Sequence, residues 1–192
     1  ETKIVKSLLN KIEKNESIDE LEIAILGCFK PLNTSLIISE KLMEYYSSNK
    51  LFNDFIDMQV REPKKEKELI KTIKSIGQIS NKVSKKVQTQ YEENPYPRWR
   101  YITSGIKLNF LNILNSNIKP NKVESKNKFL NPNVLIAGCG TGQQLENIIC
   151  YEKSNIFALD LSLSSLAYAK RKMQELNFNE IEFLHGDILS LQ

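Results

Sequence analysis

Residues 134–144, VLIAGCGTGQQ, join four apolar residues to three glycines at alternate positions. The apolar run is typical of a buried parallel strand. Glycines at 138, 140 and 142 let the backbone turn tightly and approach a ligand without Cβ clashes. The stretch therefore predicts a strand, a glycine loop (residues 138–142) and a helix N-terminus, in the order that a nucleotide pocket requires.

The residues that follow continue this alternation. Helical spacing predicts helices over 142–151 and 163–176, and apolar runs predict strands over 155–159 and 180–184. The C-terminal part is thus expected to be α/β, as the βαβαβ half of a Rossmann-like doubly wound sheet. Asp160 ends the second strand, where an acidic side chain accepts hydrogen bonds from a ribose diol.

The glycine spacing separates two classes of cofactor. The dinucleotide fingerprint GxGxxG requires a third glycine at position 143, where the chain has Gln143. The pattern found is GxGxG, which ends at Gly142. An NAD-dependent oxidoreductase is therefore the weaker alternative.

The glycine loop, Asp160 and the Gly186-Asp187 pair, in this order, resemble the class I S-adenosylmethionine-dependent methyltransferases. The resemblance covers residues 133–189. It implies S-adenosylmethionine as the cofactor, S-adenosylhomocysteine as the product that also binds, and methyl transfer to an unidentified small molecule or protein. It implies cofactor contacts from Ala137, Gly138, Gly140, Gly142, Asp160, Leu161, Asp187 and Ile188.

The resemblance also implies a role for each contact. Asp160 would bind both ribose hydroxyls, and Leu161 would cover one face of the adenine. Asp187 would accept a hydrogen bond from the exocyclic amine, and the Ile188 N–H would reach a ring nitrogen. The chain departs from the family at Ile136, where many members have an acid that contacts the cofactor's ammonium group.

Residues 90–101, QYEENPYPRWRY, form the second distinctive stretch, here called the aromatic segment. Its two prolines hold the backbone extended, so its aromatic side chains are presented stiffly. It resembles a segment that precedes the methyltransferase domain in a group of bacterial proteins. It either packs on the domain as a strap or closes the site as a lid. The lid alternative assigns substrate or lid contacts to Tyr91, Tyr96, Arg98 and Trp99, with Tyr96 or Arg98 closing the site.

The rest of the chain predicts the domain organisation. Residues 1–89 are expected to form an α-helical accessory region, 90–128 the aromatic segment, a helix over 103–115 and a linker, and 129–192 the N-terminal half of the methyltransferase domain. The chain is expected to be truncated after the third strand, and the fragment alone inactive. The N-terminal helices are a candidate surface for a protein partner. Eight lysines within 64–86 are read as a solvated helix face rather than a nucleic-acid surface.

Composition excludes several other classes. The three cysteines and the single histidine lack metal-ligand spacing, so no metal is expected. No apolar run approaches the length of a membrane span, and a cytoplasmic protein is predicted. No catalytic base is identified, and a structural role is expected for His185. A noncatalytic cofactor-binding or interaction module is the alternative to an enzyme.

Overall fold

The computed structural model describes residues 3–14, 16–102, 108–120, 122–124, 131–148 and 151–191. The chain forms two compact units, Glu1–Lys65 and Glu66–Gln192, here called the first and second units. Each has its own hydrophobic core. Residues 66–89, which the sequence grouped with the N-terminal helices, belong to the second unit because Leu69, Ile70 and Ile73 pack into its core.

The first unit is helical, as its periodicity predicts. Asp19 and Glu22 form a reciprocal capping box at the start of its second helix, and Ser35 and Asn49 cap two later helices. The buried core includes Val5, Leu26 and Ile56. The elements are α1 (Lys3–Glu13), α2 (Glu20–Phe29), the 3-10 helix η1 (Leu32–Thr34), α3 (Leu36–Met43), α4 (Lys50–Ile56), the π-helical turn η2 (Asp57–Arg61) and α5 (Glu62–Ile70), in which the division between the units falls.

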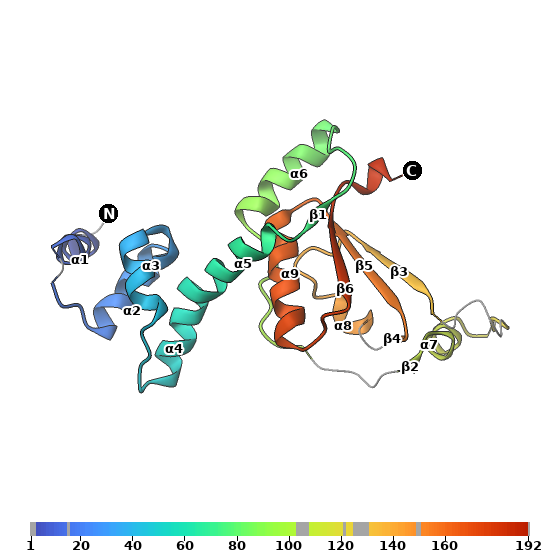
Figure 1. The fold of residues 1–192 in the computed structure, drawn as a ribbon, viewed down its shortest axis with the longest axis horizontal. Helices are drawn as coiled ribbons and strands as arrows, with labels where there is room; N and C mark the ends of the chain where they lie inside the picture. Colours follow the sequence, from blue (N-terminus) through green and yellow to red (C-terminus); the bar gives the residue numbers. More distant parts are fainter. Residues whose placement is uncertain are drawn as a thin grey trace. The chain divides into compact units, whose positions relative to one another are not determined.

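The second unit is built on a parallel sheet, so its fold is mixed α/β, as the sequence predicts. Four strands lie in the order β1-β6-β5-β3 (Figure 1). Their bounds are β1 (Lys74–Ser75), β3 (Asn133–Ala137), β5 (Asn155–Asp160) and β6 (Ile181–His185). A separate parallel pair joins β2 (Leu108–Asn109) to β4 (Tyr151–Glu152).

The three long strands agree with the sequence prediction to within one residue at each end. Asp160 lies opposite His185 in the pairing of β5 with β6, and Ala137 lies opposite Leu159 in that of β3 with β5. The polar groups that follow the three strands therefore meet at one edge of the sheet. The doubly wound arrangement of a complete sheet stays a prediction, since four strands are described in this sheet.

Among the helices of the second unit, α9 (Leu163–Glu175) packs on this sheet, whereas α6 (Lys82–Glu93) packs on α9 and α7 (Phe110–Asn117) lies beside β2. α9 lies against one face of the sheet in Figure 1, with Leu166, Ala169 and Met173 in the core. The other helices are α8 (Leu145–Ile148) and the 3-10 helix η3 (Ile188–Ser190).

The structure departs from the predicted elements in three places. The helix expected over 142–151 begins only at Leu145, as α8, and residues 149 and 150 lie outside the described part. Tyr151 is not helical, because it pairs with Leu108 in the β2–β4 ladder and its ring contacts Phe110. β1 interrupts the helical region expected over 1–89, because Lys74 and Ser75 extend the sheet beside β6. The helix expected over 103–115 begins at Phe110, and residues 103–107 lie outside the described part.

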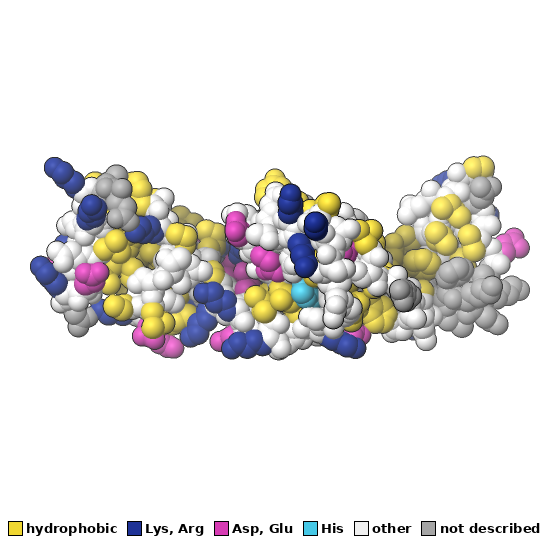
Figure 2. All heavy atoms as spheres, turned by 90° about the horizontal axis from the view of Figure 1, so that it is seen from above, with side chains coloured by type: hydrophobic (Ala, Val, Ile, Leu, Met, Phe, Trp, Pro, Cys, Tyr) yellow, Lys and Arg dark blue, Asp and Glu magenta, His cyan; other side chains and the backbone are white. Residues whose placement is uncertain are grey.

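The surface of the described residues carries both charged and hydrophobic side chains. The eight lysines within 64–86 are all exposed. On the face drawn in Figure 2, Lys and Arg side chains form separate groups between hydrophobic side chains. No described helix is long and apolar enough to cross a membrane.

Candidate cofactor site

A pocket of about 380 Å³ opens at the carboxyl ends of β3, β5 and β6. Ligands of open α/β sheets bind at this edge. One wall comes from the glycine loop and the residues after β5 and β6, and the other from α6 and the aromatic segment. The lining residues are Val87, Tyr91, Tyr96, Pro97, Gly138, Cys139, Gly140, Thr141, Gln143, Gln144, Leu159, Asp160, Leu161, Ser165, Gly186 and Ile188.

The glycine loop exposes its backbone to the pocket. Gly138, Gly140 and Gly142 have φ values of 71°, 53° and 81°, which L-residues rarely adopt. A Cβ at Gly138 or Gly140 would meet nothing within 4 Å. A Cβ at Gly142 would lie 2.7 Å from the Ala169 Cβ, so this glycine instead allows the loop to pack on α9. The first two glycines therefore leave open backbone beside the pocket.

Asp160 lines the pocket and holds its two neighbouring backbone segments together. Its Oδ2 accepts a hydrogen bond from the Gly140 N–H at 2.8 Å, and its Oδ1 accepts one from the Ser162 N–H at 2.9 Å. Each carboxylate oxygen can accept a further hydrogen bond. The side chain can therefore fix the glycine loop and still accept from a ligand hydroxyl.

Asp187 has one satisfied and one unsatisfied oxygen. The residue is 2% exposed, and its Oδ1 caps η3 by accepting from the Leu189 N–H at 3.0 Å. Its Oδ2 is buried and has no hydrogen-bond partner among the described residues. Its neighbours Gly186 and Ile188 line the pocket, although Asp187 itself does not. A buried carboxylate oxygen is costly without a partner, so this atom is suited to accept from a donor that enters beside it.

Two titratable side chains near the pocket, His185 and Cys139, interact with other groups of the protein. His185 Nδ1 lies 3.0 Å from Ser75 Oγ, and its Nε2 lies 3.0 Å from the Leu161 carbonyl, so the ring joins β1 and β6 to the residues after β5. Burial, followed by the charge of Asp160, raises the pKa of the Cys139 thiol. That thiol therefore stays protonated at neutral pH and is a poor nucleophile.

The aromatic segment divides its side chains between two directions. Tyr91 and Tyr96 line the pocket. Trp99 is buried in the core, where its indole Nε1 donates to the Thr141 carbonyl at 2.8 Å. The Arg98 guanidinium, expected to close the site, is instead paired with Glu66 at 3.1 Å and lies 4.5 Å from the centre of the Tyr168 ring. Part of the segment is thus packed on the second unit, and two of its tyrosines line the pocket.

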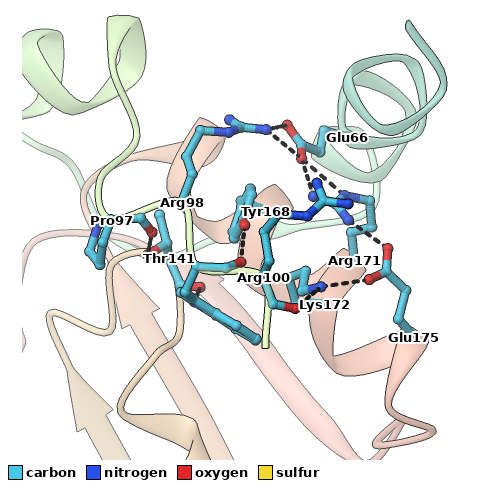
Figure 3. A network of polar contacts seen from close by, with 10 residues as sticks. Glu66, Pro97, Arg98, Arg100, Thr141, Tyr168, Arg171, Lys172 and Glu175 are labelled. Carbon is cyan, nitrogen blue, oxygen red and sulfur yellow. Dashed lines mark hydrogen bonds and ion pairs between the residues drawn. The ribbon is translucent and has the colours of Figure 1, made fainter. Parts of the chain in front are cut away.

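A network of polar contacts fixes the packed part of the segment (Figure 3). Arg171, which is 1% exposed, reaches Glu66 at 2.9 Å and Glu175 at 2.5 Å. The Tyr168 hydroxyl donates to the Trp99 carbonyl, and Lys172 donates to the Arg100 carbonyl at 3.1 Å. α5 and α9 thus hold the aromatic segment against the glycine loop.

Sequence reasoning missed several of these residues. Glu92 accepts hydrogen bonds from the backbone N–H groups of Leu163 and Ser164, at 2.6 Å and 3.0 Å, and so caps α9 from another helix. Thr141, between two glycines of the motif, donates through Oγ1 to the Pro97 carbonyl at 2.6 Å. No local pattern marks either role, because the partners lie more than 40 residues away along the chain. Among the described residues, no cluster of His, Cys, Asp and Glu is arranged to hold a metal ion.

One of three comparisons with known proteins gives a match, and it agrees with this geometry. No curated protein and no solved structure matches the chain. Residues 134–192 match the family model described as a methyltransferase domain, whose members generally use S-adenosylmethionine. The matched range contains the glycine loop, Asp160 and Asp187, so the comparison supports a methyltransferase domain in this part of the second unit.

Proposed function

We propose that the second unit binds S-adenosylmethionine in the pocket between the glycine loop and the aromatic segment, and that the protein transfers its methyl group to an acceptor. One observation carries the proposal. Open glycine backbone and the Asp160 carboxylate line one pocket at the carboxyl ends of three parallel strands, and the Asp187 Oδ2, which has no partner among the described residues, lies between the lining residues Gly186 and Ile188. The class I assignment within the methyltransferases is part of this proposal.

The residues present fit such a cofactor. The backbone of Gly138 and Gly140 would lie against its methionine part, close to Ala137 and Gly142. Asp160 would accept from the ribose hydroxyls with the lone pairs that its two backbone bonds leave free. The other contacts would be made to the adenine: Leu161 against one face of the ring, the Ile188 N–H with a ring nitrogen, and Asp187 Oδ2 with the exocyclic amine.

The amino acid end of the cofactor must be bound in this chain by residues other than an acid at position 136. Ile136 is buried and apolar, so it offers no carboxylate to the ammonium group. Arg98, paired with Glu66, does not line the pocket. Gln143 and Gln144 do, and an amide side chain can both donate and accept hydrogen bonds. We propose that these two residues bind the amino acid end.

The chemistry that such a site performs is mainly positioning. The bound cofactor supplies a methyl group on a positively charged sulfur, which is already electrophilic. The protein aligns the acceptor and excludes water, here with Tyr91 and Tyr96 at the mouth of the pocket. None of the described residues that line the pocket is Lys or Arg, so this lining does not repel a cation. A base is required only if the acceptor must lose a proton, and we assign that role to no residue.

The first unit is proposed to contact a protein partner. A groove of about 370 Å³ in this unit has an apolar floor that includes Ile12, Leu26 and Leu42. Its rim carries Glu16, Asp19, Glu20 and Lys41. A cytoplasmic location stays a prediction from composition.

The proposal is tested by titrating the wild-type protein with three ligands in a calorimeter. We expect S-adenosylhomocysteine to bind more tightly than NAD and more tightly than S-inosylhomocysteine, in which an oxygen replaces the adenine amine. The second preference depends on Asp187, because an acceptor oxygen pairs with an amine and repels a carbonyl. Asp187→Asn should remove or reverse that preference, whereas Glu182→Gln, on an exposed side chain of β6, should retain it.

The outcomes separate the candidate functions. Tighter binding of NAD would overturn the proposal in favour of an oxidoreductase. Tight binding of S-adenosylhomocysteine by a full-length protein that transfers no methyl group from labelled S-adenosylmethionine to cell extract would favour the noncatalytic module.

A further inference from the structure

The aromatic segment is tied to the glycine loop by two buried hydrogen bonds. The Trp99 indole N–H donates to the Thr141 carbonyl at 2.8 Å, and the Thr141 hydroxyl donates back to the Pro97 carbonyl at 2.6 Å. Trp99 is 7% exposed and Thr141 1%. One residue of the loop is thus held through both its backbone and its side chain by a segment more than 40 residues earlier in the chain.

A second connection joins the start of the segment to the other side of the pocket. The Glu92 carboxylate accepts from Leu163 N–H at 2.6 Å and from the N–H and hydroxyl of Ser164 at 3.0 Å and 2.6 Å. These groups form the first turn of α9, where a negative charge is favourable. α9 begins three residues after Asp160, so this contact fixes the backbone that follows the proposed ribose-binding acid.

The segment between these two contacts is itself held in place. Figure 3 shows Arg98 pointing to Glu66 on α5, and the Tyr168 hydroxyl pointing to the segment's backbone. Lys172 lies 5.2 Å from the centre of the Trp99 ring. The indole therefore has a fixed position from which its N–H can orient the glycine loop.

We infer that residues 92–99 are a positioning element of the cofactor site, in which Trp99 orients the glycine loop and Glu92 orients the backbone beside Asp160. The inference rests on the proposed function and extends it beyond the matched range 134–192. The physical reason is preorganisation. A loop with three glycines has many backbone conformations, and a site already fixed before binding loses less conformational entropy when the ligand enters.

The first test replaces the indole N–H without removing the ring. Trp99→Phe should weaken binding of S-adenosylhomocysteine by about threefold to tenfold, the effect of losing one uncharged hydrogen bond. Tyr101→Phe is the matched control, because Tyr101 is an aromatic residue of the same segment that is 90% exposed. Affinities are measured by calorimetry at a temperature where each variant is folded by circular dichroism. A purely structural role would lower the unfolding midpoint and leave this affinity unchanged.

The second test addresses the other contact. Glu92→Gln keeps one acceptor oxygen but removes the charge that two N–H groups and a hydroxyl share. We expect weaker binding of S-adenosylhomocysteine than in Glu93→Gln, a control one residue away on the same helix whose side chain is exposed. Trp99 is the only tryptophan, so its emission in the Glu92 variants reports whether the indole environment is retained.

The outcomes distinguish this inference from the function on which it rests. If the wild type binds S-adenosylhomocysteine and both Trp99→Phe and Glu92→Gln bind it equally well, the positioning role is overturned and the cofactor site stands. If the folded wild type does not bind it, the proposed function fails, and this inference with it. Should Trp99→Phe not fold, Thr141→Val removes the hydroxyl bond to Pro97 and retains the indole, and we expect the same loss of affinity.

Discussion

The two walls of the pocket are built from different parts of the polypeptide. The wall from residues 138–142 is largely backbone, opened by positive φ angles at glycines that follow a strand. The opposite wall is made of side chains, including Val87, Tyr91 and Tyr96 from α6 and the aromatic segment. A family model matches the first wall, and its match begins at residue 134, beyond the second.

The two walls differ in how far apart in the sequence the residues lie that determine their geometry. The geometry of the backbone wall follows from glycine spacing within a few residues, so a motif can describe it. The position of the side-chain wall depends on contacts such as that of Glu66 with Arg171, 105 residues away. Changes to Glu66 or Arg171, which do not line the pocket, should therefore act first on stability, and changes to the backbone wall on both stability and ligand binding.

The largest expected effect is a loss of stability on replacing Arg171, which anchors the side-chain wall through Glu66. Arg171→Ala removes one of the two guanidinium groups that pair with Glu66 among the described residues, and leaves this carboxylate, with 12% of its side chain exposed, to the partly exposed Arg98. Breaking a buried ion pair in this way costs about 3–5 kcal/mol. We expect a loss of that size in the free energy of unfolding of the second unit, followed in urea by the emission of Trp99.

Arg98→Ala is the matched control, since it contacts the same carboxylate. Its side chain is 42% exposed, and an exposed ion pair contributes about 0–1 kcal/mol. Equal losses in the free energy of unfolding for the two variants would show that burial of the guanidinium does not determine how much each ion pair contributes.

The next effect separates two glycines of the backbone wall. Gly142→Ala combines a φ of 81° with a Cβ only 2.7 Å from that of Ala169, and we expect a loss of about 2–4 kcal/mol in the free energy of unfolding. Gly140→Ala has a φ of 53° and open space around the Cβ, so about 1 kcal/mol is expected. The same urea titrations measure both, and a costlier Gly140 variant would contradict the packing role of Gly142.

Asp160 provides a smaller effect, on ligand affinity. Asp160→Ala should weaken binding of S-adenosylhomocysteine by about 1.5–3 kcal/mol, the range for hydrogen bonds to a charged group. Stability should also fall, because Gly140 and Ser162 lose their acceptor. Calorimetry on the folded variant checks the affinity, with Glu182→Ala as the control. An unchanged affinity would remove Asp160 from the site.

The smallest effect is a pH dependence of the free energy of unfolding that comes from Glu175, which pairs with Arg171. Burial acts to raise the pKa of Glu175, but hydrogen bonds from Lys172 and Arg171 outweigh it, so this pKa is lowered. A carboxylate with a lowered folded-state pKa stabilises the protein above its unfolded-state pKa, and the contribution is lost as pH falls through the folded value. Its side chain is 37% exposed, so the contribution is at most about 1 kcal/mol.

Comparing the wild type with Glu175→Gln isolates this carboxylate. We expect the wild type to be more stable at pH 7 and the difference to shrink between about pH 5 and pH 3. A difference that stays constant over this range would show that the charge of Glu175 is not its source.

The strands, the glycine loop and the acid at the end of β5 could be predicted because each depends on local residue order. The four apolar residues before Gly138 and the run before Asp160 predict strands that the structure has to within one residue. The helix after the loop was predicted too long, because side-chain periodicity does not register that Tyr151 pairs with Leu108.

The directions of the aromatic side chains could not be predicted. Tyr96 and Trp99 stand three residues apart in a stiff segment, yet the first is 75% exposed and the second is buried. The difference depends on the Thr141 carbonyl, which becomes a partner for the indole only once the loop is folded. The lid alternative assigns Arg98 to the closing of the site, but Glu66 supplies a carboxylate within the protein that pairs with it.

The central claim is that both walls bind one cofactor, and hydrogen–deuterium exchange with and without S-adenosylhomocysteine tests it most directly. We predict slower exchange in peptides that contain the glycine loop and the residues after Asp160, and also in peptides that contain Tyr91 and Tyr96. Peptides from α1 to α3 of the first unit serve as the internal reference and should not change. Protection of the glycine loop without protection of residues 91–99, or no protection of either wall, would contradict the account.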